Sequence, residues 1–242
     1  MRDLLPDWLA PRLDPEERYG LRLTLFAFAT VLIFVPFFFL LVQVTTEGPM
    51  TRLDTDISAE VHEEVLESPL LEPASRAVSF VGSPPVLYLV AGAAAIFFWR
   101  RDSRRVAVYL VLTNLLGGAI NSAVKVIVNR PRPDLDDPIS QAFGYSFPSG
   151  HTVASTVGFG SLLLAFMPFI PSRWRLVAIA AYFGAVVLVA ASRLGLVVHY
   201  LSDVLAGFVL GAAWLSASTA AFSIWRTERG EQSVEVTEGL DP

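Results

Sequence analysis

Three short segments of this sequence carry side chains that could do chemistry together. They span residues 125–133, 148–151 and 192–203, and they contain the only Lys of the chain, two of its three His and several Arg. Ammonium and guanidinium groups bind anions that have several oxygens, so the ligand that these side chains predict is a phosphate.

The cations and one predicted helix start supply the donors for such an anion. Lys125, Arg132 and Arg193 carry the positive charge. Ser149 and Gly150 precede a predicted helix, where free backbone N–H groups and a Ser hydroxyl can donate, and where Gly permits close approach. A phosphate-binding site is therefore expected from all five residues.

A nucleophile is available in the third segment. His199 and Asp203 are four residues apart, which is one helical turn, so the carboxylate can accept a hydrogen bond from one ring nitrogen. The other ring nitrogen is then free and nucleophilic. Two structural roles remain open for residues taken singly: His151 as a capping or packing residue, and Asp203 as a helix cap.

A metal site made from His151, His199 and Asp203 is the chemical alternative, because two His and a carboxylate can hold zinc or iron. The surrounding Lys and Arg disfavour a divalent cation, so we expect neither a metal nor another cofactor. The other acids that could reach the site are Asp134, Asp136 and Asp137.

The composition indicates that the protein carrying these segments lies in a membrane. The chain has 242 residues, 53% of them hydrophobic and 17% charged, with a mean hydropathy of +0.53, which is too apolar for a soluble domain. Its net charge of -5 argues against a nucleic-acid binder. The absence of Cys excludes disulfides, thiolate metal ligands and a Cys nucleophile.

Six stretches without Asp, Glu, Lys or Arg predict an all-α bundle of six transmembrane helices. The fourth stretch begins with many Pro, Gly and Ser residues, so its helix is expected from about 151 to 170. The first lacks a cleavage site and is expected to be a retained anchor. The stretches are 23–46, 77–99, 106–124, 138–172, 176–192 and 204–225.

The connection over residues 47–76 has eight acidic residues and two Arg. Its apolar residues recur every four positions, which predicts a short helix lying on the outer membrane interface. A partner-binding helix is the alternative. The apolar residues are Leu53, Ile57, Val61 and Val65.

The Arg distribution predicts the orientation. Twelve Arg lie in the N-terminus, the second and fourth connections and the tail, against six basic residues on the other side, so both termini are expected to be cytoplasmic. We divide the chain into a cytoplasmic segment 1–22, a six-span domain 23–225 and a disordered acidic cytoplasmic tail 226–242. The three segments then meet at the extracytoplasmic face of the plasma (inner) membrane. Arg130 either lies near the anion site and adds to its positive charge or, taken alone, is a topology or headgroup anchor.

Polar and small residues inside the spans are expected to serve packing. Gly207 and Gly211 form a G-x-x-x-G pattern that permits close helix contact, within the bundle in preference to a dimer. Asn114 and Asn121 are expected to form interhelical hydrogen bonds.

The three segments resemble the signature of the type 2 phosphatidic acid phosphatase superfamily, which includes vanadium haloperoxidases and bacterial nonspecific acid phosphatases. The matching patterns are K-x6-R-P at 125–133, P-S-G-H at 148–151 and S-R-x5-H-x3-D at 192–203. Their order and spacing match fully, and three such motifs in series are far more specific than any one of them.

The resemblance implies a two-step phosphoryl transfer without a metal. His199 would be the nucleophile that becomes a phosphohistidine, Asp203 would fix its tautomer, and His151 would protonate the leaving oxygen and then activate water. The residues that would hold the phosphoryl oxygens are Lys125, Arg132, Ser149, Gly150 and Arg193. No catalytic role is assigned to Arg130, Pro131 or Tyr200.

The function expected is that of an integral membrane phosphatase acting on a lipid phosphate or diphosphate, since six spans do not suit a soluble haloperoxidase. Undecaprenyl diphosphate, phosphatidylglycerol phosphate and phosphatidic acid are candidate substrates by family analogy. A phosphotransferase using the same site and a noncatalytic lipid-phosphate transporter remain as alternatives, although the latter needs no nucleophile. The partners expected are the substrate and the bilayer, with no nucleic acid and no obligate protein partner.

Overall fold

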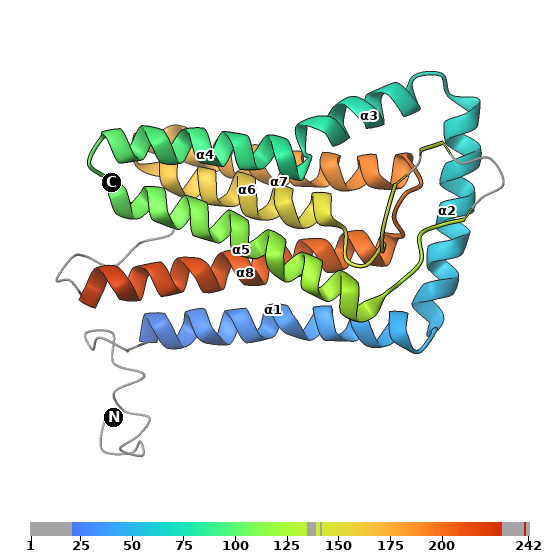
Figure 1. The fold of residues 1–242 in the computed structure, drawn as a ribbon, viewed down its shortest axis with the longest axis horizontal. Helices are drawn as coiled ribbons and strands as arrows, with labels where there is room; N and C mark the ends of the chain where they lie inside the picture. The colour runs from blue at the N-terminus through green and yellow to red at the C-terminus, as the bar shows by residue number, and fades with distance from the viewer. Residues whose placement is uncertain (1–20, 135–138, 141, 229–239, 241–242) are drawn as a thin grey trace, which may run out of the picture.

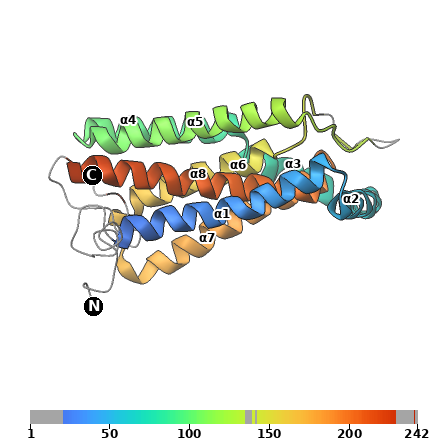
Figure 2. The same ribbon diagram turned by 90° about the horizontal axis from the view of Figure 1, so that it is seen from below.

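The chain folds into long helices lying side by side, with one helix across an end of the bundle, in the computed structural model shown in Figures 1 and 2. The structure describes residues 21–134, 139–140, 142–228 and 240, without the side chains of 21–30, 32–33 and 224–228. The helices are α1 (Leu21–Thr45), α2 (Pro49–Glu67), α3 (Leu71–Val81), α4 (Pro84–Arg100), α5 (Arg104–Val128), α6 (Gly150–Phe166), the 3₁₀ helix η3 (Met167–Phe169), α7 (Ser172–Gly195) and α8 (Leu201–Glu228).

Helical segments that could cross a membrane account for most of the bundle. In the described part of the chain, five segments are long and apolar enough: residues 71–100, 104–128, 150–169, 172–195 and 201–223. The first predicted span, 23–46, also forms one helix, α1, whose residues 34–45 are apolar. The expectation of an all-helical membrane fold is therefore confirmed.

The second predicted span is interrupted. Residues 77–99 are divided between α3 and α4 at Gly82 and Ser83, and Pro84 and Pro85 occupy the first turn of α4, where Pro is favoured. A Cβ at position 82 would collide with the side chain of Val189 on α7. The break thus lies where two helices approach too closely for any side chain.

Helix α6 is the centre of the bundle. In its apolar part 67% of the residues are buried, compared with 17% in α7 and 39% in α8. Gly207 and Gly211 of α8 face α6, because a Cβ on either would press against Thr152 or Thr156. The G-x-x-x-G prediction of packing within the bundle is confirmed, and Asn114 makes its predicted interhelical bond, to Ser161 Oγ at 3.0 Å.

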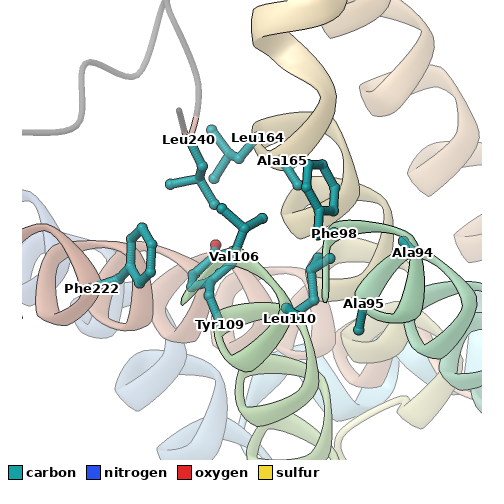
Figure 3. Packing of buried hydrophobic residues seen from close by; sticks show 11 residues of the cluster. Ala94, Ala95, Phe98, Val106, Tyr109, Leu110, Leu164, Ala165, Phe222 and Leu240 are labelled. Carbon is teal, nitrogen blue, oxygen red and sulfur yellow. The ribbon is translucent and has the colours of Figure 1, made fainter. Parts of the chain in front are cut away.

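Among the described residues, buried apolar side chains form two cores, one far from α2 and one near it. Figure 3 shows the one far from α2, where Phe98, Leu110 and Phe222 gather from α4, α5 and α8. Leu240 is buried in this core, and its N–H donates to the carbonyl of Leu164. The rest of the predicted tail, residues 229–239 and 241–242, lies outside the described residues, as does most of the predicted N-terminal segment, whereas 226–228 continue α8.

The second core lies beneath the three segments. It joins α1, α6 and α8 through Phe37, Leu40, Phe147, Val153 and Leu210. Around both cores the bundle exposes large aliphatic side chains, including Leu89, Val187 and Leu188 at 60–75% exposure. Such an apolar exterior suits contact with lipid.

The connection over 47–76 differs from the single short helix expected. Helix α2 ends at Glu67, and α3 begins within the same connection at Leu71. Helix α2 lies across the bundle end (Figure 2), but its buried residues include Asp54 and Val65, whereas Leu53 is 45% exposed. The buried face is therefore displaced by one residue from the apolar stripe at its N-terminal half.

Candidate active site

The structure brings the three segments together at the α2 end of the bundle. Lys125 lies in the last turn of α5, Arg193 in the last turn of α7, and Asp203 in the first turn of α8. Ser149 is the N-cap of α6, and His199 lies in the connection between α7 and α8. Each side chain is thus positioned by a helix end, where the chain can turn functional groups toward one centre.

His199 and Asp203 form a buried pair. Nδ1 of His199 lies 3.3 Å from Oδ2 of Asp203, and both side chains are at most 2% exposed. The same Oδ2 accepts the backbone N–H of Tyr200 at 2.9 Å. Because a carboxylate only accepts, Nδ1 must carry the ring proton.

The other ring nitrogen faces a cation. Nη1 of Arg132 lies 3.2 Å from Nε2 of His199. A guanidinium has donors and no acceptor, so Arg132 must donate, and Nε2 must hold a lone pair. Both neighbours of the ring therefore favour the same tautomer, the one in which Nε2 is nucleophilic.

Burial keeps this ring neutral. Desolvation lowers the pKa of His199 to about 4, and the positive charges of Arg132 and Lys125 act in the same direction, while Asp203 opposes them. Near neutral pH the imidazole is uncharged, as a nucleophile must be.

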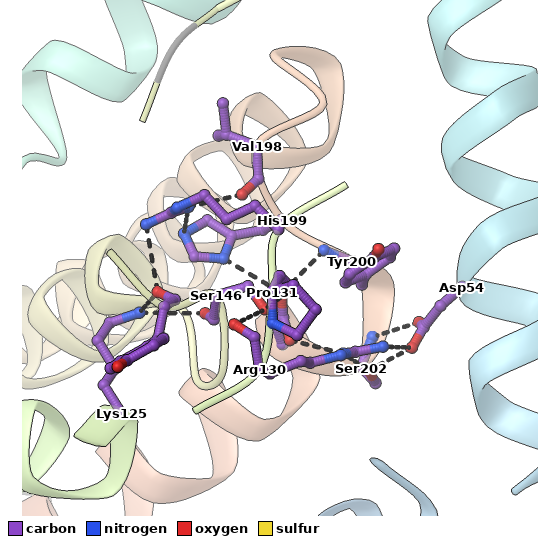
Figure 4. A network of polar contacts seen from close by, with 12 residues as sticks. Asp54, Lys125, Arg130, Pro131, Ser146, Val198, His199, Tyr200 and Ser202 are labelled. Carbon is purple, nitrogen blue, oxygen red and sulfur yellow. Dashed lines mark hydrogen bonds and ion pairs between the residues drawn. The ribbon is translucent and has the colours of Figure 1, made fainter. Parts of the chain in front are cut away.

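Backbone carbonyls orient two of the cations. Lys125 Nζ donates to the carbonyls of Tyr145 at 2.7 Å and Ser146 at 3.1 Å. Arg132 donates to the carbonyls of Gly144 and Val198, at 3.0 and 2.6 Å. Backbone carbonyls therefore orient both cations, and Figure 4 shows Lys125 directed toward Ser146.

Several buried donors in the same region have no hydrogen-bond partner. Among the described side chains these include Ser149 Oγ and Arg193 Nε, and also Thr152 Oγ1 in the first turn of α6. Nη1 of Arg193 does donate to Ser79 Oγ, from α3. Buried donors are almost always paired in native proteins, so unpaired ones at a helix start indicate where an anion would be held.

Gly150 and His151 complete the group. A Cβ at position 150 would lie 3.2 Å from Asn121 Nδ2, so a larger residue would fill the space at the start of α6. His151 is partly buried and within electrostatic reach of Arg193, His199 and Lys125. All eight residues expected to form the site are thus at the same end of the bundle.

Two buried residues of this region make contacts that the sequence did not predict. Arg130 is 9% exposed and donates to Asp203 Oδ1 at 2.7 Å and to Asp54 Oδ2 at 2.8 Å, so its interpretation as a headgroup anchor is wrong. Asp54, one of the eight acidic residues of the connection 47–76, is fully buried. The only signal was that Asp54, Ser58 and Val65 share one side of a helix.

The arrangement suits phosphoryl transfer better than metal binding. A neutral imidazole nitrogen beside three cations can attack an anionic phosphorus centre whose charge the cations stabilise. Within the described ranges, no three His, Cys, Asp or Glu side chains are grouped to hold a metal ion. Asp136 and Asp137, considered as extra acids, lie outside the described residues.

Comparisons with known proteins agree with this chemistry. The profile of the PAP2 superfamily matches residues 106–226. Phosphatidylglycerophosphatase B of Bacillus subtilis (strain 168) is 31% identical over 153 residues, covering 61% of this chain and 73% of the relative. The crystal structure of a transmembrane PAP2 type phosphatidylglycerolphosphate phosphatase from Bacillus subtilis superposes with a TM-score of 0.67 at 25% identity, covering 78% of this chain and 93% of the other.

Proposed function

This chain belongs to the PAP2 superfamily, and from that premise we propose that it is an integral membrane phosphatase that hydrolyses the phosphate or diphosphate headgroup of a lipid. The observation that carries the proposal is the orientation of His199. Asp203 accepts from Nδ1, and Arg132 lies at Nε2, so the lone pair of Nε2 is directed at the cation that would bind a phosphoryl oxygen.

In the first step, Nε2 of His199 attacks phosphorus, and the bond between phosphorus and the leaving oxygen breaks. His151 gives a proton to that oxygen, which leaves as the lipid alcohol or monophosphate. Asp203 stabilises the charge that develops on the imidazole. The oxygens of the transferring group are held by Lys125, Arg132, Ser149, Gly150 and Arg193.

In the second step, His151 accepts a proton from water as the water oxygen attacks the phosphohistidine. The bond between phosphorus and Nε2 breaks, inorganic phosphate leaves, and His199 returns to its neutral form. No step needs a metal ion, because the three cations supply the positive charge. The same intermediate would serve a phosphotransferase if an alcohol replaced water.

The membrane placement follows from the exterior of the bundle. We propose that α1 is the first of six spans and that α2 lies on the outer interface, where Asp56, Glu60 and Glu64 are exposed to water. The Arg distribution then puts both termini in the cytoplasm and the site on the extracytoplasmic side. A lipid would keep its tails in the bilayer while its headgroup reaches His199.

The substrate class is narrowed by the relatives. The Bacillus subtilis relative and the matching crystal structure are both named for phosphatidylglycerol phosphate, so we propose this lipid as the first substrate to test. Phosphatidic acid and undecaprenyl diphosphate present the same terminal phosphate and are the alternatives.

The test is a comparison of phosphate release from these three lipids by the purified chain in mixed micelles. His199→Ala should abolish release, whereas His62→Ala, a change of the His on α2, should not. EDTA should leave the rate unchanged, and vanadate, which mimics pentacoordinate phosphorus, should inhibit. Undiminished turnover by His199→Ala, or no turnover of any lipid by the unmodified chain, would contradict the proposal.

A further inference from the structure

Helix α2 reaches the catalytic end of α8 through one buried carboxylate. Oδ1 of Asp54 accepts the backbone N–H of Ser202 at 2.9 Å, and Oδ2 accepts the Ser202 hydroxyl at 2.5 Å. Ser202 lies in the first turn of α8, where backbone N–H groups have no partner within the helix. Asp54 therefore caps α8 from a position 148 residues earlier in the chain.

Arg130 joins that carboxylate to the catalytic one. Its Nη2 donates to Asp54 Oδ2 at 2.8 Å, and its Nη1 donates to Asp203 Oδ1 at 2.7 Å and to Ser202 Oγ at 2.7 Å. The guanidinium also lies over the ring of Tyr200, 4.1 Å from its centroid. Figure 4 shows Arg130 extending from its loop toward Ser202 and Asp54.

The backbone at the end of α5 positions Arg130 next to Asp54 and Asp203. Asn129 ends α5 in the left-handed conformation, with φ 53°, and its N–H bonds to the carbonyl of Lys125 at 2.9 Å. The carbonyl of Arg130 in turn accepts the N–H of Ser146 at 2.9 Å. Arg130 thus leaves the helix at a fixed point, between the phosphate-binding Lys125 and Arg132.

The two carboxylate oxygens of Asp203 consequently have different hydrogen-bond partners. Oδ1 is occupied by Arg130, while Oδ2 serves His199 Nδ1 and the N–H of Tyr200. A carboxylate with only one oxygen held could rotate away from the ring, and it would leave a buried negative charge poorly compensated. Arg130 opposes both effects, and Asp54 supplies the second anchor of its planar fork.

We propose that Arg130 and Asp54 are positioning residues for the reaction, holding Asp203 in the orientation that serves His199 and coupling α2 to the catalytic pair. This inference rests on the proposed phosphatase function. The side-chain hydrogen bonds of Arg130 and Asp54 go to each other, to Ser202 and to Asp203, so both act on His199 through Asp203.

The charges at the site come from five helices and from the loop after α5. Lys125 projects from α5, His151 from α6 and Arg193 from α7, while Arg132 lies in the loop that also carries Arg130. Of the negative charges, Asp203 is on α8 and Asp54 on α2. Removing Arg130 or Asp54 therefore changes the balance around Asp203 in opposite directions.

Because the two substitutions act in opposite directions, the direction in which the acid limb of kcat/KM moves tests the proposal. Arg130→Gln leaves Asp203 without its guanidinium, so the imidazolium of His199 is stabilised and the acid limb of kcat/KM moves to higher pH. Asp54→Asn frees the guanidinium to interact with Asp203 alone, so the acid limb does not move up. Phosphatidylglycerol phosphate in mixed micelles is the substrate for the full chain.

The rates should separate positioning from binding. By analogy with the outer partners of metal ligands, whose loss costs about 10- to 100-fold, kcat should fall about 100-fold in Arg130→Gln and about tenfold in Asp54→Asn. KM, and the inhibition constant of inorganic phosphate, should change by less than about threefold because the phosphate-binding cations remain. The double variant should lose no more than Arg130→Gln alone, since both changes act through one network.

Matched controls isolate the network. Asp56→Asn removes the same charge two residues along α2, and Arg52→Gln removes an Arg from the same helix; both side chains are exposed, and both variants should keep the full rate. Arg130→Lys keeps the charge but loses the fork, and should be intermediate. If Arg130→Gln does not fold, Arg130→Lys and Asp54→Asn carry the test.

Unchanged kcat in the folded Asp54→Asn and Arg130→Lys variants would overturn the inference, as would independent, multiplying losses in the double variant. Acid limbs that do not differ between Arg130→Gln and Asp54→Asn would also overturn it. These failures leave the unmodified chain active. Inactivity of the unmodified chain toward all lipid phosphates would instead overturn the proposed function itself.

Discussion

Arg132 donates a hydrogen bond to Nε2 of His199 across 3.2 Å, so the nucleophilic nitrogen and the cation for its target are in direct contact. A phosphoryl oxygen that takes over this donor would bring phosphorus next to the lone pair of Nε2. The guanidinium of Arg132 would therefore orient the phosphoryl group for attack by Nε2 as well as neutralise its charge.

Asp203→Asn should inactivate the protein through the tautomer of His199. Arg130 can only donate, so it should select the amide oxygen, which leaves the amide NH₂ facing Nδ1. Nδ1 then accepts, Nε2 takes the proton, and kcat should fall by about 10³–10⁴-fold. The check is turnover of a lipid phosphate beside a thermal unfolding curve, and a loss under tenfold would contradict the orientation deduced for the ring.

The pH dependence should reflect the depressed pKa of His199. Only the neutral ring can attack, so kcat/KM should fall as the pH drops through the pKa of the free protein, about 4, instead of the ordinary value of about 6.5. The second ionisation of the substrate phosphate, near pH 6, produces its own limb. Phosphorus NMR of the lipid in the same micelles separates the two, and a His199 limb at or above 6.5 would be inconsistent with the buried site.

Ser149→Ala should separate activity from stability. The hydroxyl of Ser149 is buried without a hydrogen-bond partner, so its removal should lower the unfolding temperature little or not at all. A donor that serves the transition state typically contributes about 10²–10³-fold to kcat. Equal loss of activity and stability would instead indicate a structural hydroxyl.

Gly207→Ala should disturb the start of α6. The added Cβ would lie 2.8 Å from the carbonyl oxygen of Ser149 and 3.0 Å from Thr152 Cβ, too close without movement of the phosphate-binding turn. Overpacking costs about 1–3 kcal/mol of stability, so we expect a lower unfolding temperature. Movement of the phosphate-binding turn should also lower kcat, by at least about tenfold. Gly184→Ala is the control, because a Cβ there meets nothing within 4 Å; equal behaviour of the two variants would refute the packing argument.

The orientation can be tested with a reporter fused after Trp225. Counting Arg predicts a cytoplasmic reporter, since the tail is on the Arg-rich side. A reporter between Glu67 and Leu71, in the connection between α2 and α3, should give the external readout. Reversed signals would put the site on the cytoplasmic face and leave its chemistry unchanged.

Hydropathy predicted the helix bundle because segments in contact with lipid must be apolar and free of charged residues. Five of the six predicted spans recur as single helices with ends within a few residues, and the helix ends that meet at the site follow from the alternation of the spans. The sequence predicts a bend or a helix end at Pro84 and Pro85, and the break lies directly before them; its position at Gly82 depends on the approach of Val189 from α7. Charge-free length does not report such contacts.

The candidate site was predicted where its residues belong to a recurring pattern and missed where they do not. His199, Asp203 and the cations have fixed spacings, whereas Asp54 precedes Arg130 by 76 residues and lies on a helix rich in other acids. A stripe of Leu53, Ile57, Val61 and Val65 suggested one buried face, but burial of an Asp becomes favourable only beside the guanidinium that pairs with it. Pairing of this kind is visible only in three dimensions.

The dual bonding of Asp203 has a practical consequence for capturing a bound lipid. This carboxylate also accepts the N–H of Tyr200 at the start of α8, so deleting its side chain removes a helix cap that is worth about 1 kcal/mol. The His199 side chain has no such helix-capping role. A trapping variant for structural work with an intact lipid phosphate should therefore be built at His199, with every acidic anchor of α8 left in place.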